Sequence, residues 1–146
     1  VRVNASELLR EIVGQMLSVG LPSGSGVKVE QSFEPIKIDA DDAAPLTLLV
    51  SEALTNALKY VSTVEHGKGF ISLKLIQTGP EQAMLEVRNT IGNPEEVKSG
   101  TGLGSRLILA FTRQLNGQVE VETNDDIYQI RVNFHVPTDS KMIYDY

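Results

Sequence analysis

Apolar residues recur at helical spacing in three segments of the chain and alternate with polar residues in the stretches between them. The first predicted helix begins at Asn4 or Ser6, either of which can cap it, and runs to about Val19. The second begins at N-cap candidates among residues 39–42 and runs to about Tyr60. The third covers residues 105–115 and ends before Asn116-Gly117. The extended stretches are residues 1–3, 27–33, 36–38, 70–77, 83–89, 118–123 and 127–136.

The order of these elements predicts the fold class. Strands come in adjacent pairs between helices, joined by hairpin-length loops at residues 78–82 and 124–126. This order favours a mixed, mostly antiparallel sheet with helices on one face over a doubly wound parallel sheet. We therefore expect an α+β protein, a two-layer α/β sandwich, with residues 1–146 forming a single domain.

Composition narrows the classes of function. The chain has 146 residues, of which 41% are hydrophobic, and no cysteine, so it can bury a core but cannot form a disulfide or a thiolate metal site. Its net charge of −6 argues against general nucleic-acid binding. No apolar run approaches the roughly 20 residues that span a bilayer, so we expect no membrane contact. Because the chain starts at Val1 without a methionine, we expect a fragment of a longer protein.

The second predicted helix carries the most informative polar residues. At 3.6 residues per turn, Glu52, Asn56 and Lys59 fall within a sector of roughly 60°, opposite an apolar face. A carboxamide oxygen can ligate Mg²⁺, an ammonium can meet a phosphate, and a carboxylate can orient or deprotonate a hydroxyl group. The set fits a magnesium-bound phosphate and therefore nucleotide chemistry. The alternative is an ordinary solvated helix face.

A glycine-rich turn, residues 100–104, leads into the third predicted helix. Backbone amides of such a turn, together with a helix N-terminus, form a cradle for anions. On its own the turn could be only a turn. Combined with the helix of Asn56, it predicts a phosphate site that both elements could line.

These two motifs carry a resemblance to a known family. Residues 51–60 resemble the asparagine box of the catalytic domain of bacterial sensor histidine kinases, which share an ATPase superfamily with gyrase, the large heat-shock chaperone and MutL. Residues 100–104, with Ser-Arg-Leu-Ile after them and the later Leu115-Asn-Gly117, resemble the second glycine box and its helix. The resemblance implies a Bergerat fold that binds ATP with magnesium. It also implies transfer of the terminal phosphoryl group to a histidine on separate dimerisation helices, a response regulator as partner, and a cytoplasmic, bacterial two-component system.

The resemblance also implies roles for particular residues. Asn56 would be the magnesium ligand, Glu52 a base or polarising group, and Lys59 a supporting group near the phosphates or sugar. The remaining residues expected to bind the cofactor are Tyr60, Asn89, Gly92, Gly100, Thr101, Gly102, Leu103 and Gly104. Neither His66 nor His135 resembles the phosphoacceptor motif, so the acceptor is expected outside this chain.

The chain departs from the family pattern at the adenine end. Asn89 stands where the family has an aspartate that accepts from the adenine amino group; an amide oxygen can still accept, but without charge. Alternatively, Asn89 caps the turn at Thr90. The lid, residues 94–99, is short, and Tyr128 occupies the place of a late threonine. Two other functions therefore stay open, a docking module that binds no nucleotide and an anti-sigma serine kinase of the same fold.

Overall fold

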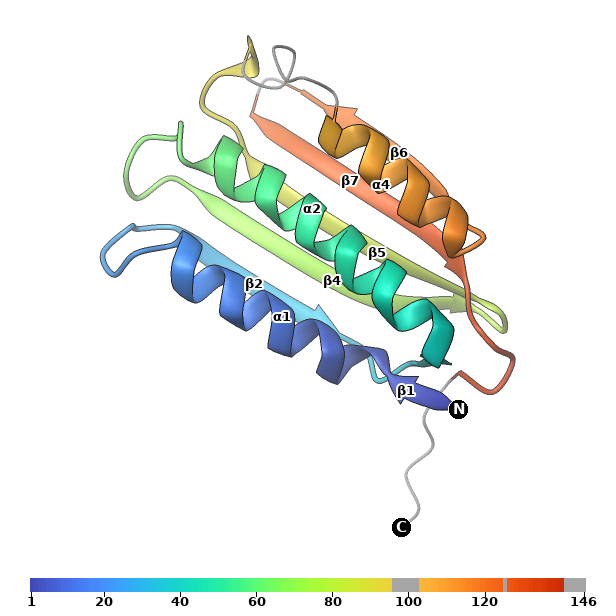
Figure 1. Cartoon of the computed structure of the whole chain (residues 1–146). Helices are drawn as coiled ribbons and strands as arrows, with labels where there is room; N and C mark the ends of the chain where they lie inside the picture. The colour runs from blue at the N-terminus through green and yellow to red at the C-terminus, as the bar shows by residue number, and fades with distance from the viewer. Residues whose placement is uncertain (96–102, 125, 141–146) are drawn as a thin grey trace.

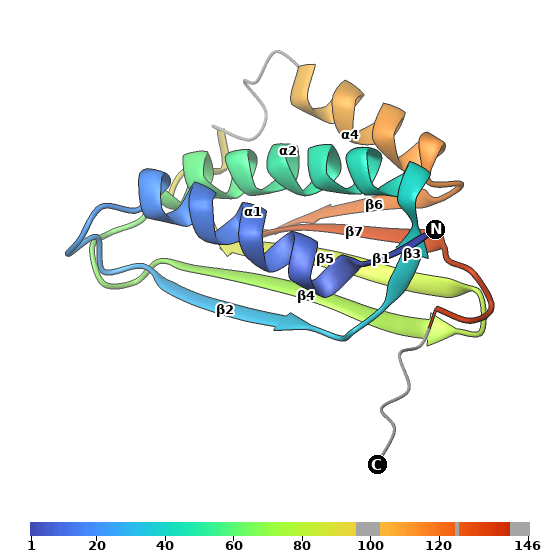
Figure 2. The same cartoon turned by 60° about the horizontal axis from the view of Figure 1, so that its bottom comes forward.

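The computed structural model describes residues 1–95, 103–124 and 126–140 and has two layers (Figures 1 and 2). The helical layer consists of α1 (Ala5–Gly20), α2 (Ala43–Val61) and α4 (Leu103–Gln114). All three lie on the same face of a five-stranded sheet, as the turned view shows most clearly. The predicted α+β sandwich is confirmed. No helix in the described part of the chain combines the length and apolar character needed to cross a bilayer.

The sheet has the predicted mixed, mostly antiparallel topology. Its order is β2 (Lys28–Phe33), β4 (Phe70–Gly79), β5 (Gln82–Thr90), β7 (Ile127–His135) and β6 (Gln118–Thr123). Only the β2–β4 pair is parallel among these neighbours; the other three pairs are antiparallel. A separate pair joins β1 (Arg2–Asn4) to β3 (Lys37–Asp39), and the short 3₁₀ helix η1 (Ala40–Asp42) then leads into α2.

The core lies between the helices and the sheet. Alternate residues of the central strands are buried there, so the period-two pattern of the sequence places one set of side chains inward. The large aliphatic and phenylalanine side chains buried in these strands are Ile71, Leu73, Leu75, Leu85, Val87, Ile130, Val132 and Phe134. The opposite sheet face is polar, and on it Arg131 Nη2 donates to Glu86 Oε2 across a distance of 3.0 Å. This ion pair supplies a hydrogen-bond donor to the carboxylate of Glu86, which is buried.

The predicted starts of the first two helices are confirmed, and the third helix begins two residues earlier than predicted. Asn4 caps α1, because its side-chain oxygen accepts from the backbone amides of Ser6 and Glu7 at 3.0 and 3.4 Å. Asp42 precedes α2 but makes no side-chain cap bond, since its backbone is already helical (φ −90°, ψ −8°) and capping requires an extended residue. Burial and the charges of Asp39 and Asp41 raise the pKa of Asp42. Helix α4 begins at Leu103 rather than at residue 105, so Gly104 belongs to its first turn.

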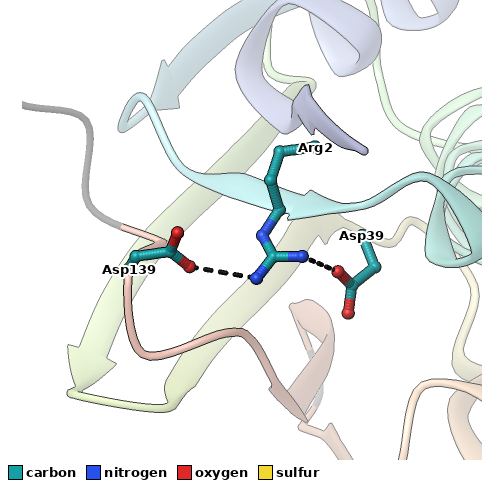
Figure 3. Close-up of polar contacts among 3 residues, drawn as sticks. All are labelled: Arg2, Asp39 and Asp139. Carbon is teal, nitrogen blue, oxygen red and sulfur yellow. Dashed lines mark hydrogen bonds and ion pairs between the residues drawn. The ribbon is translucent and has the colours of Figure 1, made fainter.

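The start of the chain is bound to the segment that follows β7 (Figure 3). The Arg2 guanidinium donates to Asp39 in β3 and, over 3.2 Å, to Asp139. The backbone amide of Lys37 donates to the carbonyl of the buried Ser140 at 2.6 Å. These bonds connect three segments that are distant in sequence at the point where the chain enters η1 and α2.

Candidate functional site

The polar face of α2 meets the first turn of α4. A Cβ atom placed on Gly104 would lie 3.3 Å from Asn56 Oδ1 and 3.5 Å from Glu52 Oε2. The two motifs that the sequence could not place together are therefore neighbours. Glycine at this position lets the α4 backbone approach the amide and the carboxylate without a side chain between them.

The chemistry of this contact follows from the two helices. The opposite side of α2 is buried in the core through Leu49, Ala53 and Ala57. Glu52 and Asn56 are therefore half-buried, and Lys59 is exposed. The first backbone amides of a helix have no acceptor within it, and the helix dipole is positive there. An anion at the start of α4 would thus meet amide donors on one side and, on the other, an amide oxygen able to ligate a hard cation.

Asn89 is the second part of the site. It lies in β5 with 1% of its surface exposed. Its Nδ2 donates to the carbonyl of Thr90 at 3.0 Å, while its Oδ1 is buried and has no partner among the described residues. The bond to Thr90 uses the donor side of the amide, so the oxygen is the group left for a ligand. A buried acceptor without a partner is uncommon and costs stability.

A pair of tyrosines in contact with each other begins beside Asn89. Tyr128 stands directly opposite Asn89 in the β5–β7 register, and its ring contacts that of Tyr60 edge to face, with centroids 4.9 Å apart and planes at 66°. Burial, with a smaller contribution from Tyr60, raises the pKa of Tyr128 to about 12, so its hydroxyl stays protonated near neutral pH. Tyr60 is buried whereas Lys59 is exposed, so these consecutive residues face different sides of α2.

Gly92 lies against the end of α2. Its amide donates to Thr63 Oγ1 at 3.0 Å, and a Cβ on it would lie only 2.0 Å from the Thr63 carbonyl oxygen. Sequence reasoning did not single out Thr63, because no local pattern indicates this long-range contact. Gly100, Thr101, Gly102 and most of the predicted lid lie outside the described residues, and of Leu103 only the backbone is described.

Comparison with known proteins identifies the family. Residues 41–140 match the family described as histidine kinase-, DNA gyrase B- and HSP90-like ATPase, and the chain belongs to it. Membership supports ATP binding by a kinase-type domain. No curated protein matches the chain.

Solved histidine kinases share the fold. The histidine kinase domain of an Erythrobacter litoralis blue-light activated histidine kinase is similar with a TM-score of 0.78 and 21% identity, over 92% of this chain and 62% of that one. A longer structure of that kinase has a TM-score of 0.79 and 22% identity, and 94% of this chain corresponds to 43% of it. The mycobacterial sensor histidine kinase MprB has a TM-score of 0.73 and 18% identity, over 94% and 97% of the two chains. This chain thus spans less than two thirds of the first two relatives.

Proposed function

We propose that this domain binds ATP with magnesium and transfers the terminal phosphoryl group to a histidine on a separate dimerisation helix, in cytoplasmic two-component signalling. The observation that carries the proposal is the close approach of the α4 backbone at Gly104 to Asn56 and Glu52. It joins a helix N-terminus, suited to phosphate, to an amide oxygen suited to magnesium.

The residues present fit the magnesium nucleotide. Asn56 would hold the metal ion through Oδ1, and a bound magnesium ion would neutralise phosphate charge. The first amides of α4 would donate to phosphate oxygens, and Lys59 would add a positive charge. Glu52, beside Asn56, would orient and polarise the reacting groups.

The orphaned oxygen of Asn89 fits the base. The exocyclic amino group of adenine is a hydrogen-bond donor, and Asn89 Oδ1 is an acceptor fixed by the bond of Nδ2 to Thr90. The carboxamide would thus replace the family's carboxylate as the acceptor, with a neutral hydrogen bond in place of a charge-assisted one.

Transfer needs positioning more than a strong base. A neutral imidazole has a nitrogen lone pair that can attack the terminal phosphorus while the bond to the bridging oxygen of ADP breaks. His66 lies in the loop after α2 and His135 ends β7, so neither lies on a helix as the proposed acceptor does. We therefore assign the acceptor to a histidine outside this chain, and the next acceptor to a response regulator.

Replacement of Asn56 by alanine tests the metal-ligand role. We expect Asn56→Ala to abolish magnesium-dependent ATP binding, measured by calorimetry with ATP and ADP, with and without magnesium. Thr55→Ala is the matched control, because Thr55 is exposed on the same helix and its hydroxyl donates to the Ser51 carbonyl at 2.7 Å. Unchanged magnesium-dependent affinity in Asn56→Ala would contradict the assignment.

The same titration separates the other two functions. If wild-type protein does not bind at about 1 mM nucleotide, near the upper end of ordinary KM values, the docking module becomes the better proposal. If it binds and phosphorylates a partner, acid treatment distinguishes acceptors, because phosphohistidine is acid-labile and phosphoserine is acid-stable. An acid-stable product would favour the serine kinase.

A further inference from the structure

A shallow, open and mostly apolar groove follows the line along which α1 packs on α2, on the side of α2 away from α4 (Figure 1). Three adjoining hollows form it. A hollow of about 200 Å³ is lined by Leu8, Glu11, Ile12, Gln15 and Thr47. The next, of about 390 Å³, shares Ile12 and Gln15 with it and adds Met16, Val19, Gly20 and Leu58. The third, of about 280 Å³, shares Gly20 and Leu58 and extends to Val61 and Val64. We call these three hollows the α1–α2 groove.

The two sides of α2 have different chemistry. Towards α4 the helix presents Glu52 and Asn56, which belong to the proposed nucleotide site. Towards α1 it presents Leu58 to an apolar stripe of α1, in which Val19 is 86% exposed. Leu8, Ile12, Met16 and Leu58 are half-buried, so part of each apolar side chain remains accessible along the groove. An apolar patch of adjoining residues marks an interaction site more often than isolated apolar residues do. Nothing in the proposed nucleotide chemistry uses it.

The shape of the groove fits a helix. The stripe from Leu8 to Gly20 extends about 18 Å along α1 at 1.5 Å per residue. A helix laid along it would place apolar side chains at i, i+4, i+7 and i+11 in successive hollows, as in other helix-in-groove complexes.

The charges around the groove select the chemistry of that helix. No lysine or arginine is among the residues that line the three hollows, and the acidic ones are Glu11 and Glu65. Glu65 is paired with Lys68 at 3.2 Å, whereas Glu11 and the exposed Glu7, one turn before it, form no ion pair with any residue that the structure describes. Arg10 donates to the Phe33 carbonyl, beside β2, and so faces away from the groove.

We propose that the α1–α2 groove is a docking surface for a partner amphipathic α-helix that carries lysine or arginine at the end nearest Glu7 and Glu11. The helix buries its apolar stripe in the hollows and pairs its basic end with the acidic end of α1. Docking is independent of the nucleotide site, because the groove and the polar face lie on different sides of α2.

A pair of synthetic peptides tests the proposal. Each has about 16 residues, with leucines at i, i+4, i+7 and i+11; one carries lysines at one end and the other carries glutamates there. Binding to the whole chain is measured by fluorescence anisotropy. We expect saturable binding of the lysine peptide and weaker binding of the glutamate peptide.

Variants locate the binding. Val19→Glu should lower the affinity for the lysine peptide by about tenfold, because a carboxylate replaces an apolar contact. Glu11→Lys should lower the affinity for the lysine peptide by about two- to fivefold and raise the affinity for the glutamate peptide. Val121→Glu on β6 is the control, since Val121 is also an exposed valine, at 54%. Val19 is so exposed that the fold should tolerate its replacement, and nucleotide affinity should not change in any of the three variants.

Three results would overturn the proposal. The first is that the lysine peptide fails to bind at about 1 mM. The second is that it binds wild-type protein and Val19→Glu with equal affinity, which would place its binding site elsewhere. The third is a dimer of the chain in sedimentation velocity that Val19→Glu dissociates, because a second copy is then the occupant.

Discussion

Asn89 combines burial with unused hydrogen-bonding capacity. The bond from Nδ2 to the Thr90 carbonyl satisfies both interpretations of the sequence in part, since Asn89 does bind the Thr90 backbone and still presents an acceptor. The sequence could identify the position but not the orientation of the amide, because that orientation depends on where β5 places the next carbonyl. In the proposed site, an acceptor that is neutral at every ordinary pH would discriminate between bases by hydrogen bonding rather than by charge.

Replacement of Asn89 by leucine tests this account. We expect Asn89→Leu to lower ATP affinity by about tenfold or more, because the amino group of adenine loses its acceptor in a buried place. Preference for ATP over GTP should shrink as well, since guanine presents a carbonyl oxygen where adenine has the amino group. Calorimetry with both nucleotides measures the ratio. Asn89→Asp serves as the control and should keep the preference; equal ATP affinity in Asn89→Leu and wild type would refute the role.

Gly14 and Gly92 lie in opposite packing environments, one with space for a side chain and one without. Gly14 lies inside α1, and a Cβ atom added to it would meet nothing within 4 Å, whereas a Cβ on Gly92 would lie 2.0 Å from the Thr63 carbonyl oxygen. No close contact requires glycine at position 14, and glycine there lowers the stability of the helix because of its low helix propensity. Gly92 permits the segment after β5 to lie against the end of α2, next to the proposed nucleotide site.

Alanine at these two positions should therefore have effects of opposite sign. We expect Gly14→Ala to raise the free energy of unfolding by about 0.5–1 kcal/mol, because alanine is the better helix former. Gly92→Ala should lower it by about 1–3 kcal/mol, because a Cβ atom would overlap backbone that cannot move away independently. Urea denaturation of both variants measures the difference. A stabilised Gly92→Ala would show that the contact with Thr63 is not needed.

The elements were predictable where one face of each is buried. Amphipathic spacing located the three helices and most of the seven strands of the described residues within a few residues, because burial of that face decides both the pattern and the structure. The strand β6 has no buried residue and was located by the hairpin loop that follows it. Asp42, one of the predicted N-cap candidates, does hold the N-cap position of α2, but its side chain makes no cap bond because residues 40–42 form η1, which no local pattern indicated. The approach of Gly104 to Asn56 was not derivable either, because no periodicity states how two helices lie on a sheet.

At the scale of the whole molecule, the side chain of Arg2 connects the two ends of the described fold. Figure 3 shows its guanidinium between Asp39 and Asp139. The hydrogen bond from Arg2 lowers the pKa of Asp139, since it favours the charged carboxylate. A carboxyl group whose pKa is lowered in the folded state stabilises the fold above its ordinary pKa of 3.8, and that contribution is lost as the pH falls through the lowered value.

Replacement of Arg2 by glutamine should thus destabilise the protein in a pH-dependent way. We expect a small drop in Tm at neutral pH, because exposed ion pairs contribute little, and a smaller drop at about pH 3, where the ordinary carboxyl group is already protonated. Hydrogen exchange should quicken at the amides of Lys37 and Ala40, which donate to Ser140 and Val1 at this junction. Lys68→Gln is the control, because the Lys68–Glu65 pair is also exposed but joins residues within one loop, so its loss should leave those amides unaffected. If Arg2→Gln left exchange at Lys37 and Ala40 unchanged, the backbone bonds alone would hold the two ends together and the arginine would be an ordinary surface residue.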